Sequence, residues 1–179
     1  MINKLLSLKE TGEIVSVFTN KNDTCTFSAG VIVGISTTHL LLAGISPYGI
    51  NDGFLLHELT SIYRFEYGGI YQKKLQKLFT LNNQKAQKFD AGSANLVDSL
   101  LLHAKSLCLI VTIELLDSEI HDIQGQVKDV YDDSVVFQTV SAYGCLENEC
   151  MVKKVDITRI VCNSEEEIAI KMLQESLQE

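Results

Sequence analysis

The stretch LLLAGISPYG at residues 40–49 recurs 95 residues further along the chain as VVFQTVSAYG at residues 135–144. Each copy is an apolar run that ends in Ser-x-Tyr-Gly, and such a run closed by turn-forming residues is typical of a β-strand followed by a turn. At the same offset, Ile-x-Arg at 62–64 falls on Ile-x-Arg at 157–159. This clustering predicts that one structural unit occurs twice in the chain.

The repeat extends beyond these motifs. Residues 14–67 align with residues 109–162 without a gap. The identical pairs are Gly30/Gly125, Ser46/Ser141, Tyr48/Tyr143, Gly49/Gly144, Ile62/Ile157 and Arg64/Arg159. Apolar positions coincide as well, and these include Ile32/Val127, Leu40/Val135, Leu42/Phe137, Ile45/Val140 and Leu56/Met151. We therefore interpret the sequence as a tandem duplication.

Each unit is predicted to contain a helix, about five strands and a second helix, which makes the fold mainly β with flanking helices (α+β). The first unit is assigned to residues 1–79, a linker to 80–93, and the second unit to 94–179. In the first unit, β-branched and aromatic runs predict strands. These strands are Ile14–Thr19, with Leu109–Glu114 as its counterpart, and Thr26–Ser36, His39–Ile45, Phe54–Leu59 and Thr60–Tyr67. Asn51-Asp52-Gly53 is expected to form a turn, and Gly30 and Gly34 are expected to mark a bulge or bend.

Amphipathic helices close both units. Tyr71, Leu75 and Leu78 recur at helical spacing with lysines on the opposite face. At the corresponding end of the second unit, Ser164 and Glu167 have the spacing of a capping box that begins a helix. The linker is rich in polar residues and has little to bury, and a helix from Ala94 to Lys105 is expected to open the second unit.

Composition excludes several classes of protein. The 179 residues are 46% hydrophobic and carry a net charge of -8, which is unlike a disordered chain. Apolar runs fall short of the roughly 20 residues that a membrane-spanning helix needs, and the first residues do not resemble a secretory signal. The five cysteines are odd in number and lack paired C-x-x-C spacing. We therefore expect reduced thiols and a cytoplasmic location.

A short helix followed by five bent strands, with Gly30 and Gly125 in the second strand of each unit, resembles the Sm-like (LSm) small barrel and, more broadly, SH3-like barrels. The segments at 62–65 and 157–160 look like the closing strand of that family. The resemblance covers residues 2–67 and 97–162, and it implies two tandem five-stranded barrels. It also implies assembly through strand pairing as an expected property.

The chain departs from the RNA-binding members of that family at two places. Their loop asparagine falls on about Leu40 and Val135 here, and the chain contains no Arg-Gly dipeptide. Without the amide, the loop lacks the paired donor and acceptor that would read a base edge. The resemblance therefore does not imply that this chain binds RNA at that loop.

Four residues are candidate ligand- or partner-binding positions: Tyr48, Arg64, Tyr143 and Arg159. An exposed turn tyrosine could stack on a base or a partner side chain. The structural alternative is that glycine supplies a positive φ in the turn while the tyrosine packs across the barrel mouth. The arginines could bridge a carboxylate between the units or bind an anion.

Motifs for known chemistry are not found in the sequence. There is no Gly-rich phosphate loop, no Ser-His-Asp order and no pair of catalytic carboxylates, so no catalytic residue, metal site or cofactor is predicted. His39, His57, His103 and His121 lack ligand spacing, and the acidic cluster at 129–133 is typical of a turn. An enzyme with an unrecognised site would require a deep pocket that holds a titratable pair with shifted pKa values.

Charge is unevenly distributed between the two halves. Residues 1–90 hold 9 Lys and Arg against 7 Asp and Glu, a net charge of +2, whereas residues 91–179 hold 6 against 16, a net charge of -10. Lysines 73, 74, 77, 85 and 88 form the densest basic group, which is typical of a solvated helix face. The acidic net charge disfavours binding to nucleic acid, and the asymmetry allows head-to-tail contacts between unlike units.

The sequence thus favours a non-catalytic protein-interaction or assembly module with a protein partner or self-association. The alternative is an RNA- or nucleotide-associated regulator that uses the aromatic turns and the two arginines.

Overall fold

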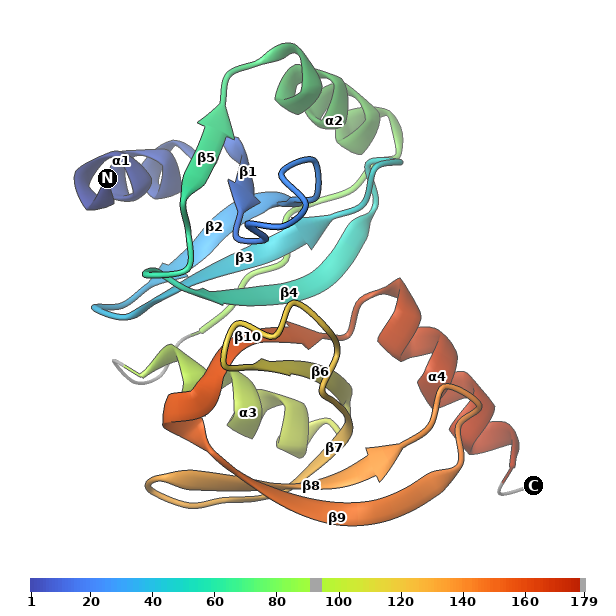
Figure 1. The fold of residues 1–179 in the computed structure, drawn as a ribbon. Coiled ribbons are helices and arrows are strands. Elements are labelled where there is room, and N and C mark those ends of the chain that lie inside the picture. The colour runs from blue at the N-terminus through green and yellow to red at the C-terminus, as the bar shows by residue number, and fades with distance from the viewer. Residues whose placement is uncertain (91–94, 178–179) are drawn as a thin grey trace. The chain divides into compact units, whose positions relative to one another are not determined.

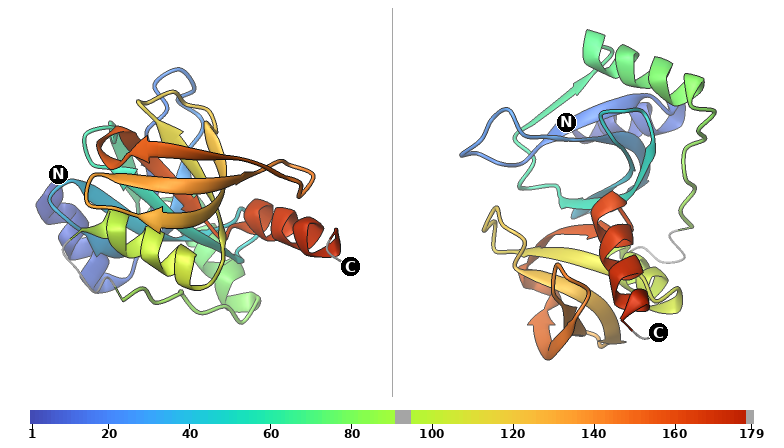
Figure 2. Two further views of the ribbon diagram at one scale, coloured as in Figure 1. Left: turned by 90° about the horizontal axis from the view of Figure 1, so that it is seen from below. Right: turned by 90° about the vertical axis from the view of Figure 1, so that its right-hand side faces the viewer.

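The computed structural model describes residues 1–90 and 95–177 (Figure 1). Over these residues the fold is mainly β with four α-helices, as the sequence predicts at that level. The chain divides into two compact units, Met1–Asp90 and Ala91–Glu179. Within each unit, five strands pair antiparallel, and several of them bend strongly (Figures 1 and 2).

The N-terminal unit begins and ends with a helix. Its elements are α1 (Ile2–Thr11), β1 (Ile14–Phe18), β2 (Ser28–Ile35), β3 (His39–Ile45), β4 (Asn51–Glu58), β5 (Arg64–Tyr67) and α2 (Ile70–Leu81). The strand order is β5-β1-β2-β3-β4, so three hairpin connections follow the chain and β5 returns to pair with β1. Helix α1 ends at Gly12, whose φ of 66° is the left-handed conformation that closes many helices.

The C-terminal unit repeats this order. Its elements are α3 (Leu96–Ser106), β6 (Ile110–Leu115), β7 (Ile123–Val130), β8 (Ser134–Val140), β9 (Leu146–Lys153), a short 3₁₀ turn η1 (Lys154–Asp156), β10 (Ile157–Cys162) and α4 (Glu165–Ser176). The strand order is β10-β6-β7-β8-β9. Among the described residues, β4 does not pair with β5 and β9 does not pair with β10. Closure of either sheet into a barrel therefore stays a prediction.

Strand register repeats between the units at the predicted offset of 95. Gly30 pairs with Gly44 and Gly125 pairs with Thr139, and a bulge follows two residues later in both hairpins. The first strand is the exception. Ile14 pairs opposite Val31 while Ile110 pairs opposite Gln126, which shifts the correspondence there to 96 residues. The gap-free alignment is therefore wrong at the first strand, because the loop after β6 is shorter than the loop after β1.

The glycine of the second strand is required by a close backbone approach. A Cβ atom on Gly30 would lie 2.2 Å from the carbonyl oxygen of Ala43, and a Cβ on Gly125 would lie 2.2 Å from that of Gln138. The β2–β3 bulge itself falls between Ile32 and Gly34. Any side chain at Gly30 or Gly125 would push adjacent strands apart, so the two glycines allow the tight bend of each sheet.

Two expectations about local structure are wrong. Asn51, Asp52 and Gly53 do not form a turn but begin β4, which pairs with β3 through a bulge at Ala43–Ile45. The last strand, expected from Thr60, begins only at Arg64. Ser61 explains the difference, because its amide and hydroxyl both donate to the Glu58 carbonyl and hold a turn there.

Helix boundaries agree more closely with the sequence. The capping box of α4 is confirmed, with the Ser164 amide donating to the Glu167 carboxylate at 2.9 Å. Helix α2 continues to Leu81, two residues beyond the expected end. Helix α3 begins at Leu96, and Ala94 lies outside the described residues.

The described part of the linker is attached to the N-terminal unit rather than free of contacts. The Asn51 side-chain amide donates to Gln84 Oε1 at 2.8 Å and to the Lys85 carbonyl at 3.0 Å. The ring of Phe89 lies 5.2 Å from the ring of Phe54, edge to face. None of residues 84–89 is buried, as the sequence predicts, although Gln84, Gln87 and Phe89 are half-buried; residues 91–93 lie outside the described part.

Candidate functional site

Tyr48 stands at the tip of the β3–β4 turn. The Gly49 amide donates to the Ser46 carbonyl at 2.9 Å, and Gly49 has a φ of 75°. A Cβ on Gly49 would lie 2.5 Å from Leu78 Cβ, so the turn packs tightly against α2. The predicted role of this glycine is confirmed, but the prediction that the tyrosine packs inward is wrong because the Tyr48 side chain is 72% exposed.

Tyr143 occupies the matching turn between β8 and β9. The Gly144 amide donates to the Ser141 carbonyl at 2.9 Å, and Gly144 has a φ of 81°. A Cβ on Gly144 would lie 2.5 Å from the Gln174 amide nitrogen of α4. The Tyr143 side chain is 81% exposed, so the inward packing predicted for it is also wrong. Each unit thus displays one tyrosine on a turn that its own C-terminal helix holds in place.

Arg64 is engaged within its own unit. Its guanidinium carbon lies 3.7 Å from the centre of the Phe18 ring, its Nη2 donates to the Thr24 carbonyl at 3.1 Å, and its Nε lies 3.5 Å from Glu66. A guanidinium stacked on an aromatic face is a favourable cation–π arrangement. These contacts tie β5 to β1 and to the loop that follows β1.

Arg159 has a different environment although it occupies the same register position. The counterpart of Phe18 is Glu114, so the guanidinium of Arg159 has a carboxylate near it in place of a ring. Burial lowers the pKa of Arg159, whereas the Glu114 and Glu167 carboxylates raise it. Burial in turn raises the pKa of Glu114, and Arg159 partly offsets that rise. Arg64 thus contacts groups of its own unit, and Arg159 interacts electrostatically with carboxylates of its own unit.

A buried polar pair joins the first strand to the last helix in each unit, and sequence reasoning missed both pairs. In the N-terminal unit, Gln72 Nε2 donates to Ser16 Oγ at 2.8 Å. In the C-terminal unit, Thr112 Oγ1 donates to Glu167 Oε1 at 2.7 Å. All four residues are at most 5% exposed. The pairs occupy equivalent positions, so the second unit has a buried carboxylate where the first has a neutral amide.

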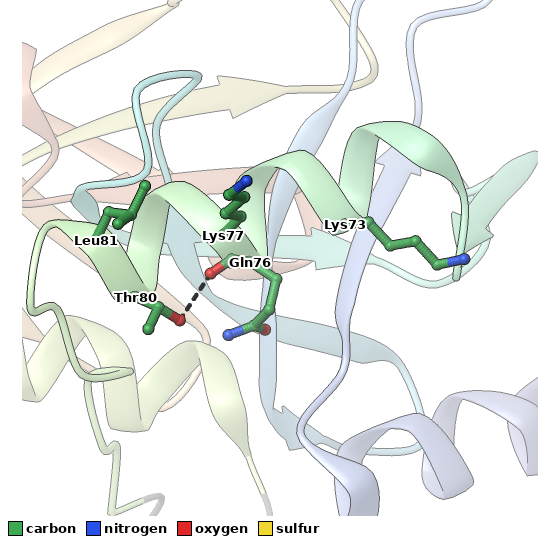
Figure 3. A pocket seen from close by; sticks show the side chains of 5 residues that line it. All are labelled: Lys73, Gln76, Lys77, Thr80 and Leu81. Carbon is green, nitrogen blue, oxygen red and sulfur yellow. Dashed lines mark hydrogen bonds between the residues drawn. The ribbon is translucent and has the colours of Figure 1, made fainter.

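The basic face of α2 contains a shallow hollow. Lys73, Gln76, Lys77, Thr80 and Leu81 line it, and Thr80 Oγ1 donates to the Gln76 carbonyl at 2.9 Å (Figure 3). The hollow is formed along one helix, and Figure 3 shows the two lysine side chains extending from separate turns. This arrangement matches the solvated helix face that the sequence predicts.

The acidic cluster at residues 129–133, which spans the end of β7 and the turn after it, has lysines beside it. Lys105 Nζ lies 3.0 Å from Asp129, and Lys154 contacts Asp98 at 2.5 Å and donates to the Tyr131 carbonyl. Over residues 1–90 and 95–177, no group of three or more His, Cys, Asp and Glu side chains is gathered as a metal site requires. The described helices include none long and apolar enough to cross a membrane.

The cysteines differ in exposure, which leads to a testable difference in reactivity. Cys25, Cys108 and Cys145 are exposed, and Cys150 is half-buried. Burial, together with the negative charge of Glu167, raises the pKa of the Cys162 thiol to about 12. Because the thiolate is the reactive form, Cys162 is expected to resist alkylation.

Iodoacetamide at pH 8, followed by peptide mass mapping, checks this expectation. The three exposed cysteines should be modified first and Cys162 only after denaturation. Modification of Cys162 in the folded chain at the rate seen for Cys25 would contradict the burial described here.

No model of a known protein family matches this chain, and comparisons with curated proteins and with solved structures likewise find no match. The function must therefore be argued from the geometry of the two units.

Proposed function

We propose that the chain is a non-catalytic assembly module built from two duplicated Sm-like or SH3-like small barrels, which self-associates head to tail through sheet edges. One observation carries the proposal: β9, the last strand of its sheet, is open along one side and exposes apolar side chains. Leu146 is 55% exposed, Met151 is 65% exposed and Val155, just beyond the strand, is 84% exposed. An edge with unpaired backbone groups and apolar side chains is a template for pairing with another strand.

The partner edge that we propose is β5 of a second copy. Strand β5 is also open along one side, and Phe65 and Tyr67 stack there with ring centres 5.8 Å apart. Lys4 lies 4.4 Å from the Tyr67 ring centre, which makes this edge locally basic. β9 carries Glu147, Glu149 and Lys153, and Glu149 pairs with Lys128 of β7, so Glu147 supplies the acidic charge of this edge. The charge difference between the halves of the chain favours this head-to-tail pairing over like-to-like pairing.

Light scattering across a concentration series tests the proposal. The mean mass should rise with concentration, and Met151→Lys should shift the midpoint of that rise at least about tenfold, because it places a charge in the proposed interface. Met172→Lys, on α4, is the matched control, since Met172 is also 65% exposed. A chain that stays monomeric at high concentration, or equal effects of the two variants, would reject β9 as the interface.

The alternative is an RNA- or nucleotide-associated regulator, and the exposure of Tyr48 and Tyr143 is the observation that favours it. Stacking of a base on an exposed aromatic ring contributes about 1–3 kcal/mol. Under this alternative, mixed RNA at moderate salt should be shifted on a gel by micromolar protein, and Tyr48→Ala with Tyr143→Ala should abolish the shift. The contacts of Arg64 within its own unit, and the Glu114 and Glu167 carboxylates that act on Arg159, count against this alternative.

A further inference from the structure

The two units differ in the small core beneath the last helix. In the N-terminal unit, this core contains Ile14, Ala29, Ile45, Leu75 and Phe79, with Phe27, Val31 and Tyr71 packed against it. In the C-terminal unit, only Ile110, Val140 and Ile170 form the corresponding cluster. By strand register and helix contact, these three are the counterparts of Ile14, Ile45 and Leu75.

The other five positions of that core have become polar. The aligned pairs, with the residue of the first unit given first, are Phe27/Asp122, Ala29/Gln124, Val31/Gln126, Tyr71/Glu166 and Phe79/Gln174. The new amides bond to one another and to the strands, with Gln126 Nε2 3.2 Å from Gln174 Oε1 and Gln124 Nε2 3.4 Å from Thr112 Oγ1. The second unit has thus exchanged apolar packing for hydrogen-bonding groups at one place in the fold.

An aromatic plug is lost with these changes. In the first unit, the Phe27 ring lies 5.0 Å from the Phe18 ring and 5.1 Å from the Tyr71 ring. In the second unit, the three counterparts are all acidic, namely Asp122, Glu114 and Glu166. Carboxylates are smaller than these rings and solvate readily, so the three do not pack together as the rings do.

A cavity of about 520 Å³ is present in the second unit where Asp122 stands. It lies between the start of β7, the end of β8 and β9. Its polar lining includes Asp122, Gln124, Thr139, Glu147 and Asn148, and its apolar lining includes Leu115, Ile123, Val140 and Met151. This volume and mixture of apolar wall with a few polar groups are typical of sites for small molecules.

The charge of the lining selects the kind of ligand. None of the residues that line the cavity is Lys or Arg, so its two carboxylates have no cation beside them in the lining. Asp122 uses Oδ2 to accept from the Leu115 amide at 2.8 Å and from the Ser118 hydroxyl, which leaves Oδ1 for a ligand. Glu147 is exposed and makes no hydrogen bond or ion pair within residues 1–90 and 95–177.

We infer that this cavity binds a small primary amine with an apolar body: the ammonium group pairs with Asp122, which stands at the position of Phe27, and with Glu147, and the body packs on the apolar wall. Charge-assisted hydrogen bonds to carboxylates provide the selectivity for a cation. The apolar wall accepts a group of the size of a phenyl ring. The inference does not rest on the proposed self-association, but the cavity shares Glu147 and Met151 of β9 with that edge, so amine binding is measured at a concentration where light scattering shows a monomer.

Titration of the full-length chain with 2-phenylethylamine, followed by amide chemical shifts in NMR spectra, tests this inference. Shift changes should concentrate at residues that line the cavity. The neutral analogue 2-phenylethanol and the anionic 3-phenylpropionate should bind at least about tenfold more weakly, since each lacks the ammonium group. No shift change at millimolar amine, or equal binding of amine and alcohol, would overturn the inference.

Variants test which carboxylates bind the ammonium group. Asp122→Asn and Glu147→Gln should each weaken amine binding about tenfold, and Asp122→Phe should abolish it by removing the carboxylate and placing a ring in the lining of the cavity. Asp132→Asn removes an equal charge from the turn after β7, outside the cavity, and should leave binding unchanged. If Asp122→Phe fails to fold, Glu147→Gln still decides, because this exposed residue has no described partner to lose. Unchanged binding in Glu147→Gln and Asp122→Asn would overturn the inference.

Discussion

Replacing Gly30 with alanine is expected to lower the free energy of unfolding of the N-terminal unit by about 3 kcal/mol or more. The added Cβ would lie 2.2 Å from the Ala43 carbonyl oxygen, and the neighbouring atoms are backbone of β3 that cannot rotate away. Relief therefore requires that β2 and β3 separate, which breaks ladder hydrogen bonds of the sheet. Gly125→Ala should cost the C-terminal unit a similar amount, since the same 2.2 Å contact forms with Gln138.

Gly68→Ala is the matched control for this prediction. Gly68 has a φ of 68°, and a Cβ there meets nothing within 4 Å. The control therefore carries only the backbone cost of a left-handed residue, about 1–2 kcal/mol. Urea unfolding followed by circular dichroism measures all three variants, because the chain has no tryptophan to report by fluorescence. Equal losses in Gly30→Ala and Gly68→Ala would mean that β2 and β3 are not held as closely as described.

The repeated motifs predicted the architecture because they lie where backbone geometry leaves little choice. Gly49 and Gly144 both have a positive φ, and both lie close to a helix of their own unit. The Ser-x-Tyr-Gly turn can therefore be predicted from the sequence in either copy. The alignment failed at Ile14, where a loop of different length shifts the register by one residue. The pairing register of a strand cannot be predicted from a continuous apolar run, because Leu109, Ile110 and Val111 would each suit a buried position and a shift of one residue exchanges the two faces.

The candidate site was harder to predict from the sequence than the fold. Exposure of Tyr48 and Tyr143 depends on how each turn meets its helix, and a tyrosine suits either environment. The buried pair of Thr112 and Glu167 joins residues 55 apart, and the capping-box pattern already explained the glutamate. Comparison of the two copies was the signal that could have found the cavity, since Phe27 aligns with Asp122 at the offset of 95.

Replacing Glu167 with alanine is expected to lower the free energy of unfolding of the C-terminal unit by about 3–5 kcal/mol. The buried carboxylate accepts from Thr112 Oγ1 at 2.7 Å and from the Ser164 amide at 2.9 Å, so two buried donors would lose their acceptor. Arg159 would also lose one of the two carboxylates that favour its charged form. Urea unfolding monitored by circular dichroism should detect the loss.

Glu167→Gln separates the charge from the hydrogen bonds. Gln72 shows that an amide fits the equivalent position of the first unit, where it bonds to Ser16 at 2.8 Å. The glutamine variant keeps an acceptor for Thr112 but offers the Ser164 amide an NH₂ group in place of an oxygen. It should therefore cost about half as much as alanine. Gln72→Ala, which removes one neutral bond, should cost about 1–3 kcal/mol. If Glu167→Ala cost no more than Gln72→Ala, the buried charge would add nothing to the stability of α4 on its sheet, and the two polar pairs would be energetically equivalent.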